Sequence, residues 1–350
     1  MKFISGWLNI NRRRNRLDEI EINKQISRIK KEANQYTKGT NCALCGKSCT
    51  SFCNSHTIPR FVIKNIAQNG KVYYPSMTMD NIDLKTKLNV FKANPGVEET
   101  LTFDSICREC DNAVFSCVES EEVLENEFDA KVLNLYALKV LLHAQYSKIR
   151  NANFLNVGAE KHQMSDIANI ISMPWVFDMI ESTREIEDYK STMKNNTYIK
   201  HKIIIDKIID KKTDFCCTTE LTLPFSYKGK RINNLCGIDN YAKRFGGIYT
   251  LVLPMNNNKT RIVMYYRRKY SSFDTVKEEF SNMNLEEQLQ AISNLLLIYT
   301  EEFVYNDNIL PNIKLANEII ADEIVNDPNV NNYLRKIEWL NNKKINMFNL

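Results

Sequence analysis

The sequence predicts an α+β protein in which a zinc-binding module precedes a helical region, an antiparallel sheet and C-terminal helices. Three observations lead to this prediction: two C-x-x-C pairs near the N-terminus, a stretch with helical periodicity, and four β-rich runs followed by more helix. The chain has 350 residues, of which 43% are hydrophobic and 25% are charged. This composition is typical of a folded protein with one large core or two moderate ones, and it excludes disordered and collagen-like classes.

Residues 1–40 are expected to form a basic amphipathic helix. Residues 12–38 contain nine Lys and Arg and four Asp and Glu, an excess of +5 that equals the net charge of the whole chain. The basic side chains would form either a solvated helix face or a surface that contacts phosphates. Four apolar residues recur at helical spacing and predict a stripe that docks on the rest of the protein: Ile22, Ile26, Ile29 and Ala33.

Residues 41–120 are expected to form the cysteine-rich module, and residues 121–350 an α+β region whose role the sequence leaves open. In the module, the runs KVYYPSM and KLNVFKA predict short strands, and NPGVEE predicts a turn. The second region begins with a predicted helix, and another helix is expected after Pro174. Its apolar residues recur every three or four positions: Val132, Leu135, Leu138, Leu142 and Tyr146.

Four β-rich runs predict the antiparallel sheet of the second region. They are YIKHKIIID, CCTTELTLPF, GIYTLVLP and TRIVMYYRRK, with YKGKRIN as a turn between the second and third. After Asp274 the helical periodicity returns, which predicts C-terminal helices that pack on the sheet. The apolar stripe of this stretch consists of Leu285, Leu289, Ile292, Leu296 and Tyr299.

No apolar run approaches the ~18 to 20 residues that a membrane-spanning helix needs. The apolar stretch at the N-terminus is also too short for a secretory signal. We therefore expect a cytoplasmic protein with no membrane partner. In a reducing compartment, its ten cysteines are expected to be thiols or metal ligands rather than disulfides.

The two C-x-x-C pairs predict one structural zinc site, because four thiolates close a tetrahedral shell and each pair can direct both sulfurs at one ion. The expected ligands are Cys42, Cys45, Cys107 and Cys110. Cys49 or Cys53 could replace one of them or take no part, and a set of buried free thiols is the alternative to a metal site. The remaining cysteines are expected in the core or in strands: Cys117, Cys216, Cys217 and Cys236.

Three motifs occur in the order CALC, SHTIP and CRECD. This order resembles that of the zinc-bearing HNH, or ββα-metal, endonucleases, and most closely a bacterial group with SH-x-IP and C-x-x-C-D motifs. The family pattern is C-x-x-C, then an acidic residue, His, one or two apolar residues and Pro, then a second C-x-x-C followed by Asn or His. The resemblance covers about residues 42–119 and implies a treble-clef, or ββα-metal, zinc module.

The resemblance implies a metal-dependent nuclease that cleaves phosphodiester bonds. In such a site His56 would be the general base for the attacking water, and Asp111 would be a ligand of a catalytic Mg or Mn ion. The expected partner is nucleic acid, with DNA favoured over RNA, and a defence effector against invading nucleic acid would fit this activity. One departure stands out: Ser55 occupies the position where the family has its acidic residue.

Alternatives remain open at each of these positions. His56 could instead be a zinc ligand or a packed ring, and Asp111 could be a helix N-cap. Glu119 is expected on the same helix face as Asp111, where it would position Arg60 or the SHTIP turn. The whole module could also have lost catalysis and bind nucleic acid or a partner protein, in an oligomeric state that the sequence leaves open. The other histidines carry no partner motif and are expected to be ordinary surface or core residues: His143, His162 and His201.

Overall fold

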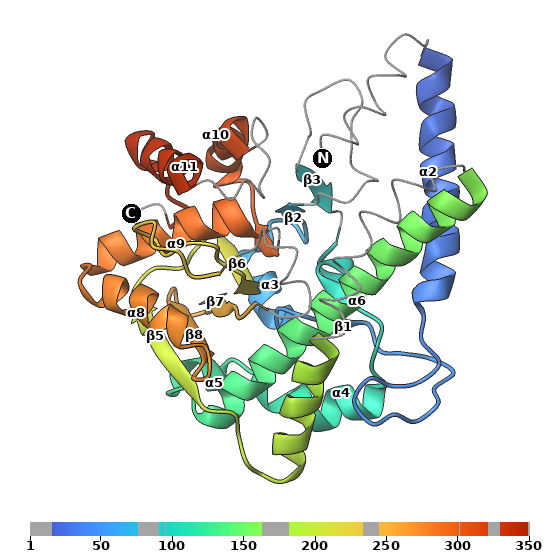
Figure 1. The fold of residues 1–350 in the computed structure, drawn as a ribbon, viewed down its shortest axis with the longest axis horizontal. Helices are drawn as coiled ribbons and strands as arrows, with labels where there is room; N and C mark the ends of the chain where they lie inside the picture. Colours follow the sequence, from blue (N-terminus) through green and yellow to red (C-terminus); the bar gives the residue numbers. More distant parts are fainter. Residues whose placement is uncertain are drawn as a thin grey trace.

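A seven-stranded sheet forms the centre of the protein in a computed structural model (Figure 1). The structure describes residues 16–75, 91–94, 96–162, 182–233, 245–300, 302–320 and 330–348. The strand order is β3-β2-β9-β6-β7-β8-β5, and each neighbouring pair is antiparallel. The strands are β2 (Val72–Pro75), β3 (Phe91–Asn94), β5 (His201–Ile209), β6 (Phe215–Leu221), β7 (Ile248–Pro254), β8 (Thr260–Arg267) and β9 (Phe303–Tyr305).

The sheet is the middle layer of the fold, because both of its faces are covered. Successive side chains of a strand point to opposite faces. Accordingly, Phe215 and Cys217 pack in a core with the C-terminal helices, whereas Cys216 between them packs in a second core. Every residue of β7 and β8 is buried, which explains why these strands read as near-continuous apolar runs. The predicted antiparallel sheet is confirmed.

Helices cover each face of the sheet. One face carries α8 (Asp274–Ser281), α9 (Leu285–Tyr299), α10 (Leu310–Ile320) and α11 (Val330–Asn342), and the other carries α3 (Arg60–Ile66), α5 (Glu122–Glu125) and α6 (Ala130–His162). Residues 182–194 are also helical, and Pro174 lies outside the described residues. Three residues of the predicted stripe of α9 are buried, Leu289, Ile292 and Leu296, and Tyr299 is partly buried. Leu285 is 38% exposed because it is the first helical residue, directly after the Asn284 cap.

The N-terminal helix α2 (Arg16–Thr37) packs against the C-terminal half of α6 and crosses it at the edge of the molecule (Figure 1). Ile29 and Ala33 are buried against Val157 of α6, so the predicted docking stripe is confirmed for these two residues. The side chains of Ile22 and Ile26 lie outside the described residues, as do residues 1–15. None of the described helices, including these two long ones, has the combination of length and apolarity that crossing a membrane requires.

The cysteine-rich segment packs directly on the rest of the chain. Its strand β2 joins the central sheet through the pair Tyr73 and Tyr305. Val62 and Ile63 of α3 belong to the same core as Leu138 of α6. The sheet and the core therefore extend across the expected boundary at residue 120.

His201 is expected to make the folded state sensitive to acid. Burial and the nearby Arg267 cation lower the pKa of this histidine from 6.5 to about 4, and its Nε2 lies 2.9 Å from the Tyr189 hydroxyl. The unfolded chain therefore binds more protons than the folded chain as the pH falls from about 6.5 to about 4, so stability falls over that window, by ~3 kcal/mol.

Chemical denaturation at several pH values measures this effect, and His201→Phe is the comparison because it keeps a ring but cannot titrate. The pH dependence between about 6.5 and 4 should be much weaker in this variant. An equal pH dependence in both proteins would show that other groups control acid unfolding.

Candidate metal centre

Four cysteine sulfur atoms meet at one point of the structure. The Sγ atoms of Cys42, Cys45, Cys107 and Cys110 all lie within 4.8 Å of one another. A tetrahedral zinc ion with Zn–S bonds of about 2.3 Å holds its sulfurs ~3.8 Å apart. The four thiols are therefore arranged so that a small contraction would close them around one metal ion, and the predicted ligand set is brought together as a group.

A tight turn presents the first pair of cysteines. The Gly46 amide donates to the Cys42 carbonyl at 2.8 Å, and Asn41 and Ser48 form a bridge across the base of the turn. Gly46 has a φ of 72°, a left-handed conformation that glycine adopts without steric cost. The glycine that follows CALC in the sequence thus has a specific backbone role.

The second pair of cysteines lies at the start of helix α4 (Arg108–Phe115). Cys107 occupies the N-cap position but makes no side-chain capping bond, so its sulfur remains available to the cluster. The Cys107 amide donates to the Cys42 sulfur at 3.3 Å, which joins the two halves of the site. The positive end of the helix dipole also favours negative sulfur at this place.

The electrostatics of the cluster favour a bound cation. Burial alone would raise the pKa of the Cys42 thiol. Hydrogen bonds from the backbone amides of Cys45, Cys107 and Leu44 outweigh this effect, and together they lower the pKa from 9.0 to about 7. Burial and hydrogen bonds with the neighbouring thiols raise the pKa of Cys110. Four thiolates this close repel one another unless a divalent cation neutralises them. The donor set and its geometry are therefore consistent with zinc.

Cys49 and Cys53 lie outside the cluster. The Cys49 sulfur donates to the Lys47 carbonyl at 3.3 Å, whereas the Cys53 sulfur donates to Asp111 Oδ2 at 3.3 Å. Neither cysteine replaces a member of the predicted set. Of the other four, Cys216 and Cys217 are buried in β6 as expected, Cys236 lies outside the described residues, and Cys117 is exposed in the 3₁₀ turn Ser116–Val118, so its expected core position is wrong.

His56 lies on a short strand, β1 (Ser55–His56), which pairs with β4 (Thr102–Phe103). Its Nε2 is 3.0 Å from the Val97 carbonyl oxygen. Because a carbonyl only accepts, Nε2 carries the proton and Nδ1 keeps its lone pair. Burial, and to a lesser degree the Lys139 cation, lower the pKa of His56. The cluster of potential ligands does not include His56, so the zinc-ligand alternative for it is wrong.

Asp111 lies in the first turn of α4 and contacts the residue that precedes His56. Its Oδ1 accepts a hydrogen bond from the buried Ser55 hydroxyl at 2.7 Å, and its Oδ2 accepts from the Cys53 sulfur. The helix N-cap is Cys107, so the N-cap alternative for Asp111 is wrong. The described interactions include no hydrogen bond between His56 and Asp111.

Two ion pairs surround His56, and they differ from the expected ones. Glu119 pairs with Lys139, whereas Arg60 pairs with Glu98. The expectation that Glu119 positions Arg60 is therefore wrong. Helix α4 ends at Phe115 and a 3₁₀ turn follows, so the expected continuous helix face from Asp111 to Glu119 is also absent from the described segment.

Lys139 is a residue near the site that the sequence interpretation missed. Its side chain is only 1% exposed, and its ammonium lies 5.1 Å from the centre of the Phe115 ring as well as next to Glu119. A signal existed in the sequence, because Lys139 interrupts the apolar positions between Leu138 and Leu141 of a buried helix. A lysine at such a position needs a partner nearby.

Comparisons of the chain with models of protein families, with curated proteins and with solved structures found no match. The class of protein therefore rests on the site alone. That site consists of a four-thiol cluster able to hold a metal ion, an aspartate of the same helix that is hydrogen-bonded to Ser55, and a histidine of lowered pKa next to Ser55 in the chain.

Proposed function

We propose that the four cysteines bind one structural zinc ion within a treble-clef module. The order of elements supports this proposal: a turn with two cysteines, the antiparallel pair β1 and β4, and helix α4 with two cysteines at its start. A zinc ion would link the turn to the helix, and these two segments are 61 residues apart in the sequence (107 − 46 = 61). Its role there would be to hold β1 in place.

We further propose that the module is an HNH-like nuclease that hydrolyses phosphodiester bonds. The state of His56 supports this role, because its Nε2 is tied to a carbonyl while its Nδ1 is free to accept a proton. In the proposed reaction His56 takes a proton from water, the resulting hydroxide attacks phosphorus, and the bond to the leaving oxygen breaks. Arg60 lies near the histidine and is about half exposed, so it could contact an approaching phosphate by exchanging its ion pair with Glu98.

Asp111 is the residue that would hold a catalytic Mg or Mn ion, since each of its oxygens keeps a lone pair beyond its present hydrogen bond. Such an ion would stabilise the charge that develops on the phosphate. The expected partner is nucleic acid, and the exposed Arg28 and Lys31 of α2 provide further positive charge for its phosphates.

A second candidate function is a zinc module that binds nucleic acid without cleaving it. The hydrogen bonds of Asp111 favour this alternative, because both of its oxygens are already engaged and Ser55 supplies no carboxylate. Among the described residues, the four cysteines form the only group of three or more close His, Cys, Asp or Glu ligands. A catalytic ion would thus depend on Asp111, water and the substrate.

Asp111→Asn is expected to reduce cleavage about tenfold or more, and higher Mn should restore part of the activity, because an amide is the weaker ligand. The assay uses single- and double-stranded DNA and RNA with Mg or Mn. Glu109→Gln is the matched control, since it removes an exposed carboxylate from the same first turn of α4. Tight binding of a substrate by the parent protein with no cleavage under any condition would favour the second candidate and contradict the first.

A further inference from the structure

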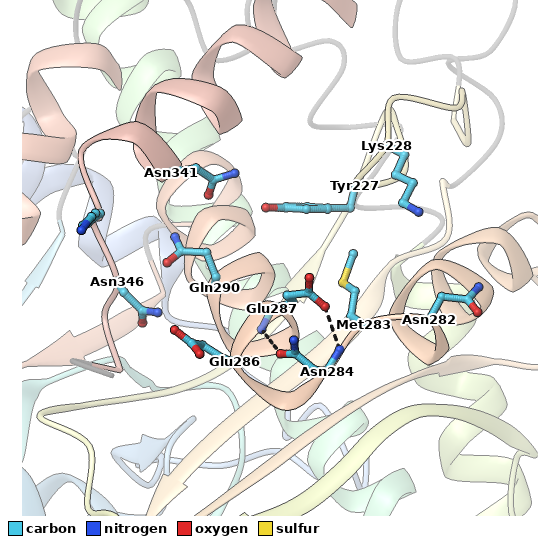
Figure 2. Close-up of a pocket in the computed structure, with 11 residues that line it drawn as sticks. Tyr227, Lys228, Asn282, Met283, Asn284, Glu286, Glu287, Gln290, Asn341 and Asn346 are labelled. Carbon is cyan, nitrogen blue, oxygen red and sulfur yellow. Dashed lines mark hydrogen bonds between the residues drawn. The ribbon is translucent and has the colours of Figure 1, made fainter.

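A polar cavity of about 690 Å³ lies among the C-terminal helices, between the start of α9, the end of α11 and the turn at Tyr227 (Figure 2). These elements cover the face of the sheet opposite to the cysteine-rich module. The volume is within the range of small-molecule sites. A ligand in this cavity would therefore bind apart from the candidate metal centre and independently of the proposed nuclease.

A buried amide at the back of the cavity, Asn294, fixes the orientation of its neighbours. Asn294 is fully buried, and its Oδ1 accepts from Gln290 Nε2 at 2.9 Å. Gln290 Nε2 also donates to the Ile345 carbonyl at 2.8 Å. Because a backbone carbonyl only accepts, the atom that contacts Ile345 must be the amide nitrogen of Gln290 and not its oxygen. The two contacts, to Ile345 and to Asn294, use both hydrogens of this nitrogen. The Gln290 oxygen is left without a partner in the described structure.

Because the Asn294 oxygen accepts from Gln290, the other atom of its amide group is the nitrogen, which donates to residues on the opposite side. Its Nδ2 donates to the Tyr227 hydroxyl at 3.0 Å and to Asn341 Oδ1 at 2.8 Å. The Asn341 nitrogen and the Tyr227 hydroxyl hydrogen therefore remain as donors, and neither has a partner among the described residues. Figure 2 shows the Tyr227 hydroxyl pointing toward Asn341 and Gln290, so the three available groups gather at one end of the cavity.

The cavity thus offers two donors, from Asn341 and Tyr227, and one acceptor, from Gln290. The Tyr227 ring extends from these groups, with the Met283 side chain on one side of it (Figure 2). A complementary ligand is flat and carries two acceptors and one donor on one edge. Uracil has two carbonyl oxygens beside an N–H, and cytosine has a carbonyl oxygen and a ring nitrogen beside an amino group.

The cavity lining carries equal numbers of positively and negatively charged side chains. Lys228 and Lys344 line it together with Glu286 and Glu287, and Glu287 already accepts from the Asn284 amide at 2.8 Å. A site for a highly charged polyphosphate would need an excess of positive charge. We propose that this cavity binds a pyrimidine nucleobase, with the ring against Tyr227 and its polar edge toward Asn341 and Gln290.

Titration calorimetry of the full chain with UMP, CMP, GMP and ribose 5-phosphate tests this assignment. UMP and CMP are expected to bind, and ribose 5-phosphate is not, because it lacks the base. GMP should bind about tenfold more weakly or worse, since the Watson–Crick edge of guanine presents two donors and one acceptor, and its N7/O6 edge presents two acceptors without a donor. His56→Ala should bind UMP as the parent does, which separates this result from the outcome of the nuclease proposal.

Asn341→Asp is the decisive variant, because it keeps the oxygen that accepts from Asn294 but replaces the outward donor by an acceptor. It should weaken UMP binding about tenfold. Asn342→Asp makes the same charge change one residue further along α11, outside the cavity lining, and should leave binding unchanged. Thermal unfolding of both variants confirms that they fold.

Several results would overturn the proposal. Equal binding of ribose 5-phosphate and UMP would identify a phosphate or sugar site instead. Equal or tighter binding of GMP would contradict the pyrimidine edge. Absence of binding by both pyrimidine nucleotides, or parental affinity in Asn341→Asp, would show that the cavity does not recognise a base.

Discussion

Cys107→Ser should destabilise the protein by more than about 4 kcal/mol, which is the range reached when a structural metal is lost. The variant would leave three thiols of the cluster without their fourth partner, so that they could no longer hold a zinc ion between helix α4 and the turn at Cys42 with a complete set of sulfur ligands. A metal chelator should lower the unfolding temperature of the parent protein for the same reason. Both effects can be measured by thermal and denaturant unfolding.

Cys117→Ser is the matched control for this experiment. Cys117 is exposed and lies in the 3₁₀ turn directly after α4, outside the cluster. It should unfold at the same temperature as the parent protein. If Cys107→Ser and Cys117→Ser were equally stable, and the chelator had no effect on the parent, the cluster would have no structural role.

His56→Ala should reduce phosphodiester cleavage by about 10²- to 10⁴-fold, the usual contribution of a general base. Zinc content and unfolding temperature should change little, because His56 is not part of the thiol cluster. His56→Gln is the sharper variant, since its amide nitrogen takes the place of Nε2 and can still donate to the Val97 carbonyl, but it offers no titratable nitrogen. It should be as inactive as the alanine variant.

The pH dependence of cleavage tests the same role. A general base works in its neutral form, so the rate should rise with pH as His56 loses its proton and then level off. Burial lowers the pKa of His56, and the midpoint of this rise should therefore lie below its ordinary value of 6.5. Cleavage at the parental rate by zinc-replete His56→Ala would end the catalytic assignment.

The parts of the fold that depend on local pattern could be predicted from the sequence. Ligand spacing within a C-x-x-C pair is local, and each pair indeed places its sulfurs in the cluster. The central strands were also evident, because burial on both faces makes them continuously apolar. Leu285 was misjudged because helical periodicity does not show where the first turn begins.

The parts that depend on contacts between distant segments could not be predicted. Glu119 pairs with Lys139 because α4 ends at Phe115 and the chain turns toward α6. The hydrogen bonds of Asp111 to Ser55 and Cys53 join residues more than fifty positions apart. Sequence spacing contains no information about such pairs, and the amide network around Asn294 was missed for the same reason.

Metal analysis of the natively purified chain decides whether the cysteine cluster is a zinc site. Plasma mass spectrometry should find about one zinc ion per parent chain, and Cys107→Ser should hold far less. Inclusion of Cys117→Ser, which should keep the parental zinc content, excludes a general effect of cysteine loss. A parent chain that contains no zinc after purification without chelators, and takes up none when zinc is supplied, would contradict both the zinc site and the nuclease module that depends on it.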